Sequence, residues 1–125
     1  YCGEIDIMEL VGKNPKQVVG SFHWKNDDAS EGTINNRYDL TAGDFSQDFH
    51  LYSLVWGKDQ YQILVDNKVY VTAKPSDIKA AYNPFNHPFY LIFNVAVGGD
   101  WPGSPDGSTS FPQKMLVDYV RVYQQ

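Results

Sequence analysis

Residues 60–73 read QYQILVDNKVYVTA, and their pattern sets the fold class. Apolar and polar side chains alternate on both sides of Asp66-Asn67, which is the period-two pattern of β-strands. A two-residue turn of Asp and Asn is typical of a tight β-hairpin. The stretch therefore predicts two antiparallel strands that are joined at Asp66-Asn67.

Further runs of the same kind lie on both sides of this hairpin. They are rich in β-branched and aromatic residues, and turn-forming residues separate them, so each predicts a strand. The runs cover residues 4–11, 17–24, 34–40, 49–57, 87–99 and 114–124. Only residues 75–82, PSDIKAAY, predict a short helix, with Ser76 as its N-cap. The chain is expected to be all-β and, without a linker or repeat, to form one domain.

Composition excludes several classes of partner. The chain has 125 residues and a formal net charge of −5 without any run of Lys or Arg, so we expect neither a nucleic-acid nor a membrane partner. With Cys2 as the single cysteine, no internal disulfide can form, and zinc-site spacing is absent. No apolar stretch reaches the ~18 residues of a membrane span, and the acidic start does not resemble a signal peptide. The start resembles that of a mature or truncated chain.

The run EIDIME carries three carboxylates, Glu4, Asp6 and Glu9, within a predicted strand. Burying an unpaired carboxylate is costly, so acids among large apolar side chains suggest a function. Alternate residues of a regular strand share a face, which would turn Glu9 away from the other two acids. A β-bulge at Ile7-Met8 would add one residue and bring all three acids onto one face.

With such a bulge, Glu4 and Glu9 could lean toward each other over Asp6. Retaining glycosidases hold their two carboxyl groups about 5–5.5 Å apart, whereas inverting enzymes keep them about 6.5–9.5 Å apart. Two other interpretations stay open at this point. The acids could form a solvated strand face by chance, or they could bind a hard cation, although the usual loop spacing of a cation site is missing.

The segment GEIDIME at residues 3–9 resembles the E-x-D-x-x-E signature of family 16 glycoside hydrolases of the laminarinase type. The segments FHLYSLVWGKDQYQILVDNKVY, PFYLIFNVAVGGDWPG and FPQKMLVDYVRVYQ resemble later parts of the same enzymes, in the same order. The resemblance implies a β-jelly-roll, concanavalin-like sandwich with a cleft for a glucan chain. It also implies retaining endo-hydrolysis of β-1,3-glucan or β-1,3-1,4-glucan in a secreted or extracellular protein.

The same resemblance assigns roles to the three acids. Glu4 matches the nucleophile, Asp6 the assisting aspartate and Glu9 the acid/base, and the chemistry needs no cofactor. The five-residue step from Glu4 to Glu9 is similar to the bulged subgroup, which favours a laminarinase-like substrate. Lichenases and xyloglucan-active relatives usually carry the shorter E-x-D-x-E.

Two polar residues outside this run are candidates for substrate binding. The resemblance implies that His23 faces the cleft near Glu9, although a histidine satisfied by the backbone is an equal alternative. Asn94 is an amide inside an otherwise apolar run, so it needs hydrogen-bond partners. Sugar hydroxyls or the catalytic acids could supply them, and so could a purely structural arrangement.

The tryptophans and one aspartate complete the candidates. Trp101 lies in the Gly- and Pro-rich loop 98–112, so its ring is expected to stack on a sugar. Trp24 and Trp56 belong to predicted strands and are expected in the core. Asp118 matches a position that binds a structural calcium ion in many of these enzymes.

One departure from the family is large, because the half of the catalytic domain that precedes the acidic strand is missing. Residues 1–125 are therefore expected to be the C-terminal part of a single catalytic domain and to form part of a sandwich. The missing N-terminal half would then be a partner, as a separate chain or as part of a longer precursor. The alternatives are a non-catalytic β-glucan-binding domain of the same fold, an inactive fragment, and a sugar-binding jelly-roll lectin with metal ligands in its loops.

Overall fold

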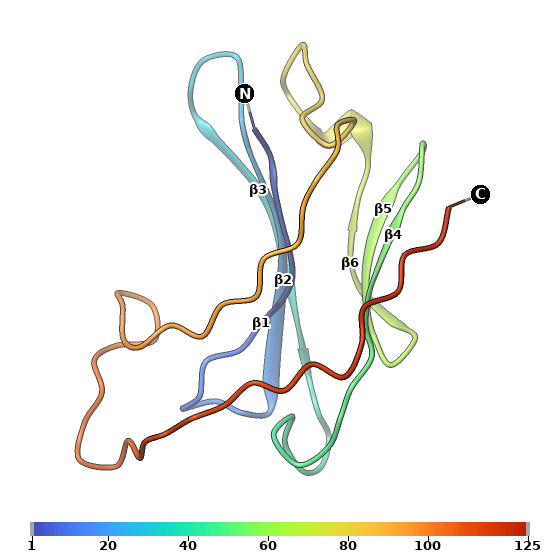
Figure 1. Cartoon of the computed structure of the whole chain (residues 1–125). Helices are drawn as coiled ribbons and strands as arrows, with labels where there is room; N and C mark the ends of the chain where they lie inside the picture. Colours follow the sequence, from blue (N-terminus) through green and yellow to red (C-terminus); the bar gives the residue numbers. More distant parts are fainter. Residues whose placement is uncertain (1, 125) are drawn as a thin grey trace. The chain divides into compact units, whose positions relative to one another are not determined.

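The structure, a computed structural model, describes residues 2–124 and divides into two compact units, Tyr1–Phe89 and Tyr90–Gln125 (Figure 1). The strands of the described chain all lie in the first unit. They are β1 Glu4–Glu9, β2 Gln17–Lys25, β3 Glu31–Asp39, β4 Tyr52–Trp56, β5 Tyr61–Val65 and β6 Lys68–Ala73. They form two three-stranded antiparallel sheets, β1-β2-β3 and β4-β5-β6. The all-β class that the sequence predicts is confirmed.

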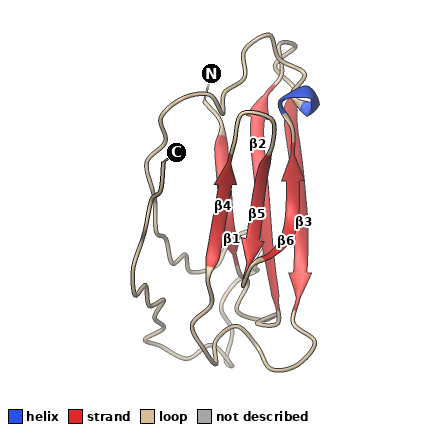
Figure 2. Ribbon diagram, turned by 90° about the vertical axis from the view of Figure 1, so that its right-hand side faces the viewer, coloured by secondary structure: helices blue, strands red, loops and turns tan. Residues whose placement is uncertain are grey.

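The two sheets of the first unit pack face to face as two layers (Figures 1 and 2). Every second residue of β2 and β5 points into the space between them, as the period of a strand requires. The largest fully buried side chains are Tyr61, Phe22, Phe85, Ile63, Val18 and Val65. The core therefore lies between the sheets, and the outer face of β1-β2-β3 is left for polar side chains.

The predicted hairpin is present, and its turn has the predicted residues. Asp66 and Asn67 adopt φ angles of 47° and 64°, the left-handed pair that a tight two-residue hairpin needs. The Asp66 carboxylate also holds the segment before β4, because it lies 2.7 Å from His50 Nδ1 and accepts a 3.0 Å hydrogen bond from the amide of Leu51.

Three local predictions are wrong. Residues 87–99 and 114–124 form no strand, because a strand needs a neighbouring chain to pair its backbone groups, and these segments have none among the described residues. The predicted helix at 75–82 is reduced to the short 3₁₀ turn Pro75–Asp77, with Lys74 rather than Ser76 at its N-cap. Among residues 2–124, no helix is long and apolar enough to cross a bilayer.

Candidate active site

The acidic strand β1 contains the predicted bulge. Asp6 pairs with Ser21 of β2, and the next pair along the strand joins Glu9 to Val19. Between these pairs β1 holds two residues, whereas β2 holds only Gly20. The extra residue restores the alternation, so Glu4, Asp6 and Glu9 share one face of the sheet.

The register also identifies the polar neighbours of the acids. His23 lies opposite Glu4, and Ser21 lies opposite Asp6. The pairing of β2 with β3 adds three more side chains to this face, namely Thr33, Asn35 and Arg37. Ser21 and the β3 residues were not among the residues predicted from the sequence. Counting back two residues from His23 could have found Ser21, but nothing local fixes the register of β3.

Three polar contacts lie on this face. The Nε2 atom of His23 lies 3.4 Å from Oδ2 of Asp6, and its Nδ1 atom lies 2.9 Å from Oγ1 of Thr33. Ser21 donates a 3.5 Å hydrogen bond from Oγ to Oε2 of Glu9. The observed contact of His23 is therefore with Asp6 rather than with Glu9, and Thr33 holds the imidazole in place.

Asp6 is the acid whose protonation the fold changes most clearly. Burial, followed by the negative charges of Glu4 and Glu9, raises the pKa of Asp6 to about 6, while His23 opposes the shift. A hydrogen bond with Glu4 raises the pKa of Asp6 further, because a protonated Asp6 can donate to the Glu4 carboxylate. Asp6 is thus suited to carry a proton in mildly acidic solution and to donate it in a hydrogen bond to Glu4.

This raised pKa predicts that Asp6 destabilises the folded protein at neutral pH. The folded state binds the proton more tightly than the unfolded chain, so the contribution of Asp6 to stability is full below about pH 4 and is lost as pH rises through about 6. With the side chain 20% exposed, the loss, after discount for solvent screening, is about 1–2 kcal/mol.

Asp6→Asn in the full-length protein should therefore raise the free energy of unfolding by about 1–2 kcal/mol at pH 8 and by little at pH 4. Denaturant unfolding at the two pH values measures the difference. Asp39→Asn is a matched control, because Asp39 is an exposed carboxylate at the end of β3. An equal gain at both pH values would contradict the assignment of the effect to the Asp6 proton.

The remaining predicted site residues, Asn94, Trp101 and Asp118, belong to the second unit, and their roles stay predictions. Trp101 is exposed within a turn that is closed by a 2.9 Å hydrogen bond from the amide of Gly103 to the carbonyl of Gly99. Both glycines have positive φ angles, 81° and 138°, which side-chain-bearing residues rarely adopt. The glycines of this loop therefore make the turn that presents the Trp101 ring.

The predicted calcium site stays a prediction that rests on Asp118 alone. Residues 2–124 contain no group of three or more His, Cys, Asp or Glu side chains that could hold a metal ion. Calcium usually takes several oxygen ligands, so Asp118 by itself does not make a site. The calcium ion stays a prediction that depends on further ligands.

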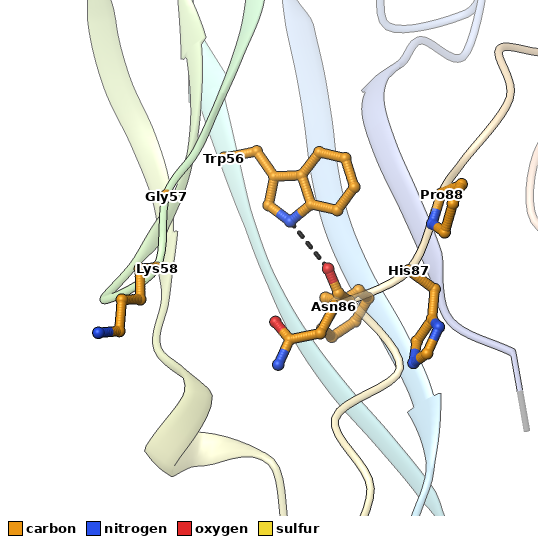
Figure 3. A pocket seen from close by; sticks show the side chains of 7 residues that line it. Trp56, Gly57, Lys58, Asn86, His87 and Pro88 are labelled. Atoms are coloured by element: carbon orange, nitrogen blue, oxygen red, sulfur yellow. Dashed lines mark hydrogen bonds between the residues drawn. The ribbon is translucent and has the colours of Figure 1, made fainter. Parts of the chain in front are cut away.

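A hollow of about 540 Å³ lies beside β4, the edge strand of its sheet among the described residues (Figure 3). Its lining residues are Trp56, Gly57, Lys58, Phe85, Asn86, His87 and Pro88. Trp56 pairs with the buried Tyr61, so it points toward the inside of the sandwich, and its Nε1 donates a 2.9 Å hydrogen bond to the carbonyl of Phe85. Trp24 is buried, as predicted, but Trp56 is 45% exposed, because β4 is an edge strand. None of the predicted site residues lines this hollow.

A β-sandwich that carries a row of carboxylates on one sheet face matches the class of glycoside hydrolases, whose chemistry depends on paired acids. The chain belongs to glycosyl hydrolases family 16, because the sequence profile of that family matches residues 1–121.

Individual relatives agree with this family. The chain is 39% identical to glucan endo-1,3-beta-glucosidase A1 of Niallia circulans, over 98% of this chain and 19% of that protein. Its fold resembles the laminarinase catalytic domain of Thermotoga maritima, with a TM-score of 0.76, 40% identity and coverage of 88% of this chain and 45% of that one. For the endo-beta-1,3-glucanase of Pyrococcus furiosus the TM-score is 0.78, with 38% identity and coverage of 88% and 43%. The predicted jelly-roll fold is confirmed, and the chain spans less than half the length of these relatives.

Proposed function

We propose that this chain is the C-terminal part of the catalytic domain of an endo-β-1,3-glucanase that cleaves with retention of configuration. One observation carries the proposal: the bulge in β1 brings Glu4, Asp6 and Glu9 onto one face of the sheet. The names of the glucanase relatives support β-1,3-glucan as the substrate class, and the proposal includes β-1,3-1,4-glucan as the alternative substrate. Action on such a polysaccharide also suggests a secreted or extracellular protein.

The proposed reaction has two displacements. In the first, Glu9 gives its proton to the departing glycosidic oxygen while Glu4 attacks the anomeric carbon, and a glycosyl-enzyme ester forms. In the second, Glu9 takes a proton from water, which attacks the same carbon and releases Glu4. Asp6 assists Glu4 through the hydrogen bond between them, in which the protonated Asp6 donates to the Glu4 carboxylate.

The other candidates are proposed to bind the substrate or a metal ion. His23 would contact the substrate from beside Asp6, while Asn94 would offer its amide to sugar hydroxyls. The exposed ring of Trp101 would stack on a pyranose. Asp118 would contribute one ligand to a structural calcium ion, and the chemistry itself would use no cofactor.

The test is the stereochemistry of hydrolysis by the full-length protein. With laminarin as substrate, ¹H NMR should show the β-anomer of the new reducing end first and the α-anomer only after mutarotation. Lichenan in a parallel assay reports on mixed linkages. Early appearance of the α-anomer would contradict the retaining mechanism, and release of no sugar from either glucan would contradict the glucanase function.

A second candidate function is β-glucan binding without hydrolysis. One relative at 32% identity, covering 91% of this chain and 38% of that protein, is a beta-1,3-glucan-binding protein of Penaeus monodon. The three acids in this chain favour catalysis, because the two displacements need a nucleophile and a proton donor, whereas binding of a neutral glucan needs neither. Laminarin binding by calorimetry with no reducing sugar released would favour the binding protein or an inactive fragment.

A further inference from the structure

The second sheet contains a bulge of its own, and Tyr70 is its extra residue. Ile63 pairs with Val71, and the adjacent pair joins Leu64 to Val69, so Tyr70 has no opposite residue on β5. Tyr70 and Val71 are consecutive residues, yet both are buried. A regular strand would expose one of them, so the bulge is what turns Tyr70 into the sandwich.

The Tyr70 side chain crosses the core and meets the bulge of β1. Its hydroxyl donates a 2.8 Å hydrogen bond to the carbonyl of Ile7, one of the two bulge residues between Asp6 and Glu9. Gly20 lies opposite that bulge, and its lack of a side chain provides the space for the Tyr70 ring. A Cβ at Gly20 would lie 2.9 Å from the Tyr70 hydroxyl. The two bulges therefore touch each other through Tyr70.

Tyr70 is also held at its backbone. Asn36 of β3 donates a 2.9 Å hydrogen bond from Nδ2 to the carbonyl of Tyr70. The hydroxyl and the carbonyl of Tyr70 thus bind the first sheet at two strands, β1 and β3. Such a residue can fix the separation and the offset of the two sheets at the point where the acidic strand bends.

The contact matters because a bulge disrupts the backbone ladder of its strand. A carbonyl that loses its ladder partner in a partly buried place costs free energy unless another donor binds it. The Tyr70 hydroxyl is that donor for Ile7. Without this hydrogen bond the bulge in β1 is less stable. The bulge is what places Glu9 on the same face as Glu4 and Asp6.

We propose that Tyr70 is a positioning residue for the acid/base Glu9, acting through the β1 bulge. The inference rests on the proposed function for the role of Glu9. It goes further in assigning control of the proton donor to a tyrosine of the opposite sheet, which touches no catalytic atom. Removing the Tyr70 hydroxyl should therefore impair proton transfer to the leaving group more than attack by Glu4.

The experiment compares two substrates in the full-length protein. A β-1,3-linked gluco-oligosaccharide needs a proton from Glu9, whereas the 2,4-dinitrophenyl β-glycoside of the same sugar leaves without one. Tyr70→Phe should lower kcat/KM for the oligosaccharide by about 10- to 100-fold, the range expected when a catalytic group is misplaced by about 1 Å. The dinitrophenyl glycoside should lose less than about 3-fold. Because the two rates come from one preparation, their ratio does not depend on the folded fraction.

Two further variants sharpen the comparison. Gly20→Ala should show the same selectivity, because its Cβ displaces the Tyr70 ring from the bulge. Tyr61→Phe is the matched control, since it also removes a buried tyrosine hydroxyl of this sheet, but one that accepts a 2.8 Å hydrogen bond from Asn83. Equal losses on both substrates in Tyr70→Phe, or the same selectivity in Tyr61→Phe, would overturn the proposal.

Hydrogen exchange separates this proposal from the proposed function. Tyr70→Phe should speed amide exchange at residues 7–9 by about 5- to 10-fold, as expected for the loss of one hydrogen bond, and Tyr61→Phe should not. If the wild-type protein cleaves neither substrate, the proposed function fails. An unchanged amide exchange rate at residues 7–9 in Tyr70→Phe would overturn the role of Tyr70. Faster exchange would retain Tyr70 as the residue that holds the bulge.

Discussion

Glu4→Gln in the full-length protein is expected to lose laminarin hydrolysis to below detection while the fold stays intact. Glutamine keeps the size of the side chain but cannot form the glycosyl ester, so the first displacement has no nucleophile. Glu9→Gln should lose about 10²–10⁴-fold in kcat, the range usual for a general acid/base. Reducing-sugar release and far-UV circular dichroism measure activity and fold on the same samples.

Azide distinguishes the two roles. With Glu4→Ala, azide should attack the anomeric carbon of an activated β-glycoside directly and yield the α-glycosyl azide. With Glu9→Ala, Glu4 still forms the ester, so azide should give the β-glycosyl azide. Glu31→Gln is the matched control, because Glu31 is an exposed strand carboxylate that binds Lys25, and it should keep full activity. Full activity of Glu4→Gln, or azides of the opposite configurations, would contradict the assignment.

Residues 1–125 expressed alone are expected to show no glucanase activity and to self-associate. The second unit carries exposed apolar side chains that no strand pairing covers, and such surfaces drive association in water. They include Tyr90, Leu91, Ile92, Phe93, Val95, Val97, Leu116, Val117, Val120, Val122 and Tyr123. Adding the rest of the catalytic domain as a second chain should restore the pairing and, with it, laminarin hydrolysis.

Light scattering and reducing-sugar assays, with and without the complementary chain, test this expectation. Leu116→Gln and Val122→Gln should weaken both self-association and complementation, because both side chains are exposed apolar groups of the predicted strand at 114–124. Lys114→Gln is the control from the same segment and should change neither. A monomer of residues 1–125 that hydrolyses laminarin by itself would overturn the proposal that this chain is one part of a longer catalytic domain.

The two segments that form no strand show that a local sequence pattern does not suffice to predict strand pairing. Residues 87–99 and 114–124 have the composition of strands, but composition supplies no partner for the backbone N–H and C=O groups. The strands that do form are close to neighbours in sequence, for example β5 and β6 across Asp66-Asn67. Strand propensity is thus a condition for pairing rather than its cause.

The candidate site also has features that the sequence predicts and features that depend on the folded structure. The sequence by itself determined that three acids lie in one strand, and the spacing of Glu4, Asp6 and Glu9 predicts a bulge that puts them on one face. The crowding of the three negative charges follows from the same spacing, because the acids are only a few positions apart. Burial, the largest cause of the raised pKa of Asp6, depends on the folded structure.

Only the tertiary structure decided which residues support the acids. Thr33 reaches His23 through the register of β3, and Tyr70 reaches Ile7 from the opposite sheet, 63 positions away in the chain. The physical reason is that such contacts depend on how strands align and how sheets stack, which side-chain packing over the whole core sets. The spacing along the sequence predicts the row of acids, whereas strand register and packing between the sheets set the contacts that hold this row in place.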